Sequence, residues 1–113
     1  MSAAYVSNLV INTYTDFSQV FSLSNDQSNS ALDLTGYTIR SQMRKHQKSS
    51  TAVSFATTVY NYSFGQIQIG LTTSQTSTLK PGRYIYDIVV TDNEGKTSRV
   101  VEGMVLVREG ATH

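Results

Sequence analysis

Residues 79–107 read LKPGRYIYDIVVTDNEGKTSRVVEGMVLV and outline a β-hairpin. A Lys-Pro-Gly turn comes first, and two runs rich in Val, Ile and Tyr follow it, separated by the acidic turn at residues 92–95. β-branched and aromatic runs bounded by turn residues are typical of paired antiparallel strands. Both faces of residues 84–90 are apolar, which predicts a central strand. Gly103 in the second run predicts a bulge, or close packing beneath a bulky neighbour such as a tyrosine.

Further strands are expected on both sides of this hairpin. Apolar and polar residues alternate with a period of two, the pattern of a half-buried strand. The segments that show it are residues 17–23, 37–43, 53–57 and 67–71.

The spacing of these segments predicts an all-β fold. We expect one immunoglobulin-like antiparallel β-sandwich of about seven to eight strands. At most one short helical turn is expected, near residues 73–79, capped by Thr73 or Ser74 and ending at Leu79. The length of 113 residues fits a single domain, residues 1–113, with its core at about 5–108.

Composition argues against several classes of function. The chain has no cysteine, which excludes disulfides, thiolate nucleophiles and thiolate metal sites. Nine Lys and Arg against eight Asp and Glu give a net charge of +1, so there is no electrostatic reason to bind nucleic acid or an anionic membrane. The N-terminus lacks the basic and apolar segments of a secretory signal, and no run approaches the ~18 apolar residues of a membrane helix. We expect synthesis in a reducing cytosol, with neither nucleic acid nor membrane as partner.

Candidate catalytic residues are few and scattered. The two histidines, His46 in a basic loop and His113 at the end of the sequence, stand beside no candidate nucleophile or metal ligand. Asp92 and Glu94 occupy the hairpin turn, where acidic residues are ordinary turn formers, so calcium is only weakly indicated there. A metal site or catalytic triad needs converging ligands or a nucleophile beside a base. We therefore predict no catalytic, cofactor-binding or metal site, and no enzymatic activity.

One local cluster of basic residues follows the strand at residues 37–43. The simpler interpretation of this cluster is a solvated strand end without a binding role. The alternative is a contact with another subunit or an anionic partner, because Arg is enriched in protein interfaces. The residues predicted for such an interface are Arg40, Arg44, Lys45 and Lys48, with His46 among them.

Tyrosines and one carboxylate raise two further hypotheses. Tyr60, Tyr62, Tyr84 and Tyr86 suggest a glycan platform, with Tyr84 and Tyr86 as the residues to test, although strand tyrosines are more often core or sheet surface. Asp87 interrupts an apolar central strand. Since burial of an unpaired carboxylate is costly, we predict a structural carboxylate paired with Arg40 or Arg99 rather than a general base.

Four segments together resemble a recurrent domain of tailed bacteriophages. They are residues 34–44, 65–69, 79–88 and 102–107, and the likeness extends over about residues 16–108. The chain resembles the immunoglobulin-like N-terminal domain of phage baseplate upper proteins, and small virion proteins of similar pattern, including ones from cyanophages. This resemblance implies a virion structural component of the tail, baseplate, neck or capsid surface, with no enzymatic activity. The sequence ends directly after the domain, so the receptor-binding part of the baseplate proteins is not expected.

The leading hypothesis is therefore a protein–protein interaction module in a phage virion, made in the host cytoplasm. We expect other virion proteins as partners, a symmetric oligomer or multiple copies per particle, and docking arms at residues 1–8 and 108–113. The alternative is a carbohydrate-binding adhesion module that uses surface tyrosines. A small hydrolase is the weakest hypothesis, because the chain lacks a nucleophile–base pair.

Overall fold

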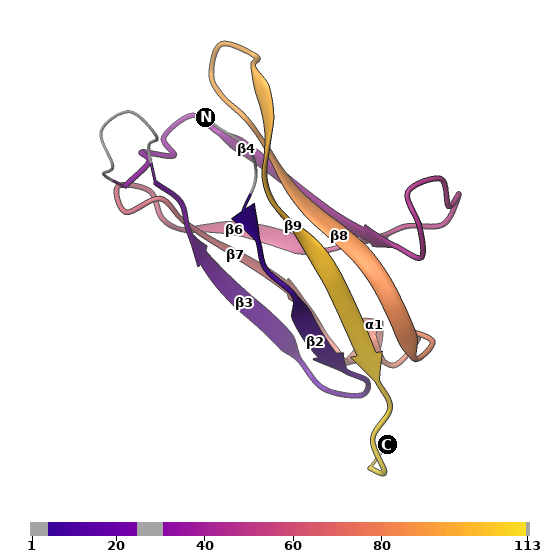
Figure 1. Ribbon diagram of the computed structural model, residues 1–113. Coiled ribbons are helices and arrows are strands. Elements are labelled where there is room, and N and C mark those ends of the chain that lie inside the picture. The colour runs from indigo at the N-terminus through magenta and orange to yellow at the C-terminus, as the bar shows by residue number, and fades with distance from the viewer. Residues whose placement is uncertain (1–4, 25–30, 113) are drawn as a thin grey trace.

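The structure is a computed structural model that describes residues 5–24 and 31–112. Two β-sheets pack face to face, and one short helical turn closes the end of the molecule near the C-terminus (Figure 1). The elements are β1 Tyr5–Val6, β2 Leu9–Asn12, β3 Phe17–Ser22, β4 Thr38–Arg44, β5 Val53–Ser54, β6 Ala56–Asn61, β7 Gln66–Leu71, α1 Thr73–Thr76, β8 Gly82–Thr91 and β9 Thr97–Arg108.

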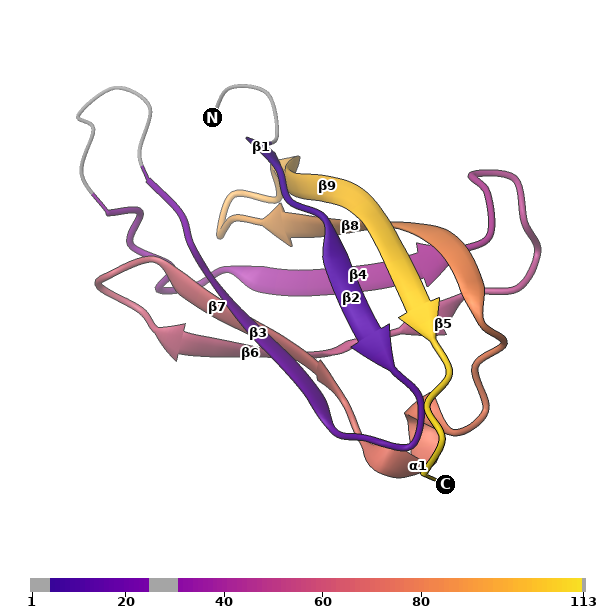
Figure 2. The same cartoon turned by 60° about the horizontal axis from the view of Figure 1, so that its bottom comes forward.

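The larger sheet has the strand order β1-β9-β8-β4-β5, with β2 following β1 along the edge of β9 (Figure 2). The smaller sheet has the order β3-β7-β6. β4-β8-β9 and β3-β7-β6 match the C-F-G and B-E-D groupings of immunoglobulin domains, which confirms the predicted all-β sandwich. The described residues form nine strands rather than seven to eight, because β1 and β5 are separate pieces of only two residues.

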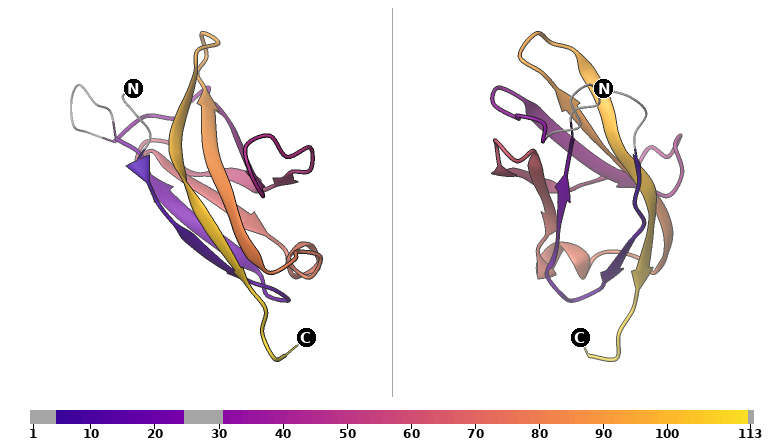
Figure 3. Two further views of the ribbon diagram at one scale, coloured as in Figure 1. Left: turned by 45° about the vertical axis from the view of Figure 1, so that its right-hand side comes forward. Right: turned by 60° about the vertical axis from the view of Figure 1, so that its left-hand side comes forward.

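The predicted hairpin is the pairing of β8 with β9, and β8 is central as expected, with β4 on its other side. Its inner face carries Tyr86, Ile88 and Val90, which belong to the hydrophobic core. The two sheets that enclose this core lie as separate layers (Figure 3). The ring of Phe55 links the layers, with its centroid 6.0 Å from that of Phe17 and 6.3 Å from that of Tyr86. Burial of these apolar side chains is the main driving force for closing the sandwich.

The sequence did not predict that the N-terminal strands β1 and β2 pair with β9. β1 and β2 both run parallel to β9 in one continuous register, with Ser7 and Asn8 between them. The Ser7 carbonyl there lies against Gly103 and accepts a 2.5 Å hydrogen bond from the Tyr86 hydroxyl, while the Ser7 N–H donates to the Glu102 carbonyl at 2.9 Å. Close packing at Gly103 is confirmed, but the bulge in the β8–β9 pairing falls at Val100.

The prediction of an N-terminal docking arm at residues 1–8 is wrong for its second half. Residues 5–8 are bound to β9 within the larger sheet and are not a free arm. Residues 1–4 and 113 lie outside the described residues.

The helical turn lies where it was predicted, with a different cap. Thr72, rather than Thr73 or Ser74, is the N-cap, and it forms a reciprocal capping box with Gln75. Hydrogen bonds continue the turn as far as Leu79. Asp16 accepts hydrogen bonds from the N–H and hydroxyl of Thr73, which fixes the start of β3 against the turn.

Changing Gly103 to Ala should destabilise the protein. The new Cβ would collide with the Ser7 carbonyl, a backbone atom that cannot rotate away, so β1 would have to shift on β9. We expect a loss of roughly 1–3 kcal/mol in the free energy of unfolding, measured by urea denaturation. Gly110→Ala is the matched control, because nothing lies within 4 Å of its Cβ position. Equal stability of the two variants would contradict the close packing of Ser7 against Gly103.

Candidate functional site

The outer face of the larger sheet brings together most of the residues singled out above. Neighbouring strands place their outward side chains in rows that cross the sheet. From β4 through β8 to β9, three successive rows are Arg40–Val89–Arg99, Gln42–Asp87–Glu102 and Arg44–Ile85–Met104.

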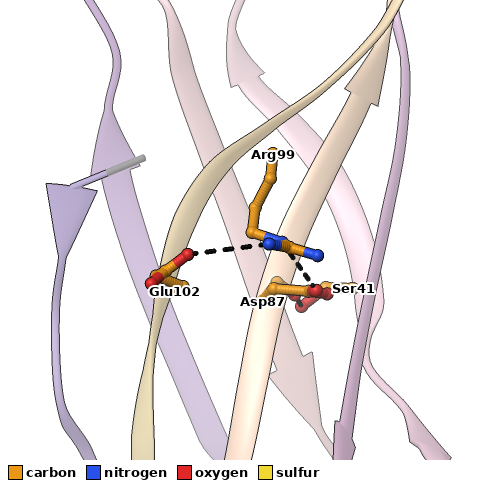
Figure 4. A network of polar contacts seen from close by, with 4 residues as sticks. All are labelled: Ser41, Asp87, Arg99 and Glu102. Carbon is orange, nitrogen blue, oxygen red and sulfur yellow. Dashed lines mark hydrogen bonds and ion pairs between the residues drawn. The ribbon is translucent and has the colours of Figure 1, made fainter. Parts of the chain in front are cut away.

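An ion-pair network occupies the centre of this face (Figure 4). Asp87 and Glu102 lie directly opposite each other on β8 and β9. Two like charges in that relation are destabilising. Arg99 offsets the repulsion, with its Nε 3.1 Å from Asp87 Oδ2 and its Nη1 3.8 Å from Glu102 Oε1. From the inner side, the Ser41 hydroxyl donates a 2.7 Å hydrogen bond to the backbone carbonyl of Asp87.

Asp87 therefore has a partner, and the partner is Arg99 rather than Arg40. The carboxylate of Asp87 is not buried. It lies on the outer face of β8, which is open to solvent, and the side chain is 37% exposed. With this exposure the pair contributes little stability by itself. Its effect is to balance charge across the β8–β9 ladder, and a structural role for Asp87 stays a prediction.

Two open hollows flank the Gln42–Asp87 row. One, of about 410 Å³, lies towards β5 and β6 and reaches Phe55 and Thr57. The other, of about 450 Å³, lies between the end of β4 and the middle of β9. Its outward lining residues are Gln42, Arg44, Gln47, Ile85, Asp87, Arg99, Glu102 and Met104.

An apolar strip borders the second hollow. It consists of Val10, Ile85, Met104 and Leu106, which continue one another across β2, β9 and β8. Val10, Met104 and Leu106 are between 40% and 48% exposed. Scattered exposed apolar residues are ordinary on protein surfaces, whereas a contiguous group with a charged rim is typical of an interaction site.

The predicted basic cluster is split by the sheet. Arg44 points to the outer face, where it donates to the Ser49 carbonyl at 2.6 Å and to Gln42 Oε1 at 3.2 Å. Lys45, the next residue, lies on the other face, with its Nζ 4.7 Å from the centre of the Tyr84 ring. Arg40 and Lys48 are exposed. Arg44 and Lys45 therefore do not share a surface, and a role in an interface stays a prediction for each of the four residues.

Tyr84 and Tyr86 do not form an exposed platform, so these residues were the wrong choice for a glycan site. Tyr86 is 4% exposed, and burial raises the pKa of its hydroxyl to about 12. Tyr84 is half-buried, with Lys45 over its ring and its hydroxyl bound to the Lys80 carbonyl. Both rings point inward, because side chains alternate along β8 and Tyr84 and Tyr86 share the face that Ile88 and Val90 turn to the core.

The most exposed aromatic rings lie elsewhere, at the end of β6 and in the turn that follows it. Tyr60, Tyr62 and Phe64 are each more than half exposed. The turn is well fixed, because Asn61 Oδ1 accepts hydrogen bonds from the N–H of Phe64 and the hydroxyl of Ser63. The carbonyl of Tyr62 also accepts from the N–H of Leu34 and of Gly65. We call Tyr60, Tyr62 and Phe64 the aromatic turn.

Chemistry-bearing residues do not converge elsewhere in the described part of the chain. No group of three or more His, Asp or Glu residues could hold a metal there. His46 lies in the exposed β4–β5 loop, His113 is outside the described residues, and Asp92 accepts the N–H groups of Glu94 and Lys96 as an ordinary turn residue. No helix among residues 5–24 and 31–112 is long and apolar enough to cross a membrane.

Comparisons with known proteins give two weak likenesses. No protein-family model matches the chain, and no curated protein matches it. An internalin-like protein of Listeria monocytogenes is 14% identical, with a TM-score of 0.46 over 95% of this chain and 28% of that one. A family 123 glycoside hydrolase from Clostridium perfringens is 13% identical, with a TM-score of 0.44 over 94% of this chain and 23% of that one. The chain thus spans about a quarter of each, and at these TM-scores neither likeness bears on its function.

Replacing Arg99 with Met tests the charge balance at the centre of the outer face. Asp87 and Glu102 would then face each other without a cation between them, and we expect a loss of roughly 0.5–1 kcal/mol in urea denaturation at neutral pH and low salt. Adding Glu102→Gln to that variant should restore most of the loss, while Glu102→Gln alone should have a smaller effect. No recovery in the double variant would show that repulsion between the carboxylates is not the cause.

Proposed function

We propose that this chain is a non-enzymatic protein–protein interaction module that binds other structural proteins through the outer face of its larger sheet. The observation that carries the proposal is the apolar strip, a contiguous group of the half-buried Ile85 and the exposed Val10, Met104 and Leu106. The proposed setting is the virion of a tailed bacteriophage, where the module would occur in multiple copies on the tail, baseplate, neck or capsid surface.

Three properties of the outer face support an interface. Met and Arg are enriched in protein interfaces, and Met104 and Arg44 both line the larger hollow. A hollow beside an apolar strip can receive an anchoring side chain of a partner, the arrangement found at energetic hot spots. The charged Arg99 network forms part of the rim, where charge steers association and sets orientation more than it adds affinity.

The phage setting rests on the sequence resemblance and not on this geometry. Three of the four segments that carry it, residues 34–44, 79–88 and 102–107, cover β4, most of β8 and the centre of β9, whereas the fourth, residues 65–69, lies mostly in β7 of the smaller sheet. Because β4, β8 and β9 form the candidate face, most of the resemblance concerns the same part of the molecule as the surface argument.

Met104→Asp should abolish incorporation into particles while leaving the fold intact. A carboxylate in the middle of the strip would have to be desolvated on binding. The measurement is quantitative mass spectrometry of purified virions after complementation with the wild-type or variant chain. Ser18→Asp, an equally exposed change on the smaller sheet, is the control and should be incorporated normally. If the wild-type chain is missing from purified particles, the virion role is wrong.

A carbohydrate-binding function is the second candidate, moved from Tyr84 and Tyr86 to the aromatic turn. Exposed tyrosine rings offer an apolar face to a sugar and a hydroxyl for hydrogen bonding. Tyr62→Ala should then remove retention on immobilised host-cell glycans, whereas Met104→Asp should not. Failure of the wild-type chain to bind any glycan on such an array would exclude this candidate.

A further inference from the structure

The smaller sheet contains no charged side chain. None of the residues in β3, β7 or β6 is Asp, Glu, Lys or Arg, and the whole segment 49–79 lacks these residues. The charged residues lie instead in the larger sheet, the loops and the ends of the chain. Both edge strands of the smaller sheet, β3 and β6, are therefore uncharged.

Open edges are normally protected against pairing with other strands. Proteins place Lys, Pro or inward-pointing charge on them, shorten them, or cover them with a loop. β6 has six residues, and neither charge nor Pro occurs in it. Three consecutive β-branched residues, Thr57, Thr58 and Val59, favour the extended conformation that pairing requires. A bulge in the pairing with β7 occurs only near its end, between Val59 and Asn61.

We propose that β6 pairs antiparallel with β6 of a second copy of this chain, across a two-fold axis. The two smaller sheets then form one sheet of the order β3-β7-β6-β6-β7-β3. The axis passes midway between two equivalent residues, because only then do outer-face side chains meet outer-face side chains. Thr58, the central outward residue, lies opposite Thr58 of the partner subunit, and Ala56 lies opposite Tyr60 of the partner subunit.

Charge selects a second copy as the occupant. A two-fold axis places residues near the axis beside their own equivalents, so a charge there would repel itself. β6 meets this condition without compensation, because it has no charge to repel and offers none to a partner of opposite sign. The pair of Thr58 with Thr58 of the partner subunit, which this register creates, is a favourable cross-strand pair.

The contact is small and therefore weak in isolation. Pairing along six residues buries less than the ~1,600 Å² of a standard interface. Neighbouring copies held in a larger assembly would strengthen it through their effective concentration. The edge is distinct from the apolar strip, so it can operate whether or not the strip binds a virion partner.

Cysteine crosslinking tests this pairing directly, because the chain has no cysteine of its own. Opposite residues of an antiparallel pair have Cα atoms roughly 4.5–5.5 Å apart, within the range that a disulfide spans. Thr58→Cys should form a disulfide-linked dimer at least about tenfold faster than Ser18→Cys under mild oxidation. Ser18 is the matched control, since it is exposed on the same face at the opposite edge, on β3.

A second pair of variants fixes the register. Ala56→Cys mixed with Tyr60→Cys should crosslink as a heterodimer, and neither alone should. Thr58→Lys should remain monomeric in analytical ultracentrifugation at concentrations where the unmodified chain dimerises, with an unchanged thermal transition. Met104→Asp should dimerise normally, which separates this edge from the proposed function.

Three results would overturn the proposal. The first is equal crosslinking of Thr58→Cys and Ser18→Cys, which indicates random collision. The second is preferential crosslinking between those two variants, which indicates head-to-tail pairing of β6 with β3. The third is a chain that stays monomeric in analytical ultracentrifugation up to about millimolar concentration, which would put the dissociation constant of the pairing above about 1 mM.

Discussion

The ladder between β8 and β9 is the interaction on which the larger sheet depends. β8 also pairs with β4, and β9 carries β1 and β2 along its other edge, so the whole larger sheet is assembled on these two strands. The inner face of β8 supplies Tyr86, Ile88 and Val90 to the core, while its outer face supplies Asp87 to the ion-pair network. Tyr86 also binds the Ser7 carbonyl, so one strand orders the core, the candidate surface and the N-terminal segment.

Much of this fold could be predicted because its determinants are local. Alternation along residues 37–43, 67–71 and 84–90 assigns strands, and the turn at 92–95 joins the last two. The parallel docking of β1 and β2 on β9 could not be predicted, since it joins residues almost a hundred positions apart. Gly103 was the one local sign of that contact. Its missing side chain indicated a close neighbour but could not identify Ser7 as that neighbour.

The candidate surface was less predictable, because alternation separates two faces without saying which is buried. A glycan platform at Tyr84 and Tyr86 required both rings at the surface, but they face inward, whereas Asp87, which interrupts an apolar strand, faces outward. Both outcomes follow from the alternation of side chains along β8, which puts Tyr84 and Tyr86 on one face and Asp87 on the other. The basic cluster was divided for a related reason, since consecutive residues such as Arg44 and Lys45 must point to opposite sides of a strand. The apolar strip could not be predicted from the sequence, because it combines residues of β2, β8 and β9, and β2 lies beside the other two only in the folded chain.

The parallel pairing of β2 with β9 also determines how the molecule would carry mechanical load. The described chain starts at one end of the larger sheet, at Tyr5, and β9 finishes towards the other, at Arg108 (Figure 1). Tension applied between these ends pulls the two parallel strands past each other along their length. The hydrogen bonds of β1 and β2 to β9 are then loaded in shear, and several must break together. In an antiparallel hairpin pulled from its two ends, the bonds would instead open one after another. Force transmitted through this chain therefore meets its strongest resistance where its first and last strands lie side by side.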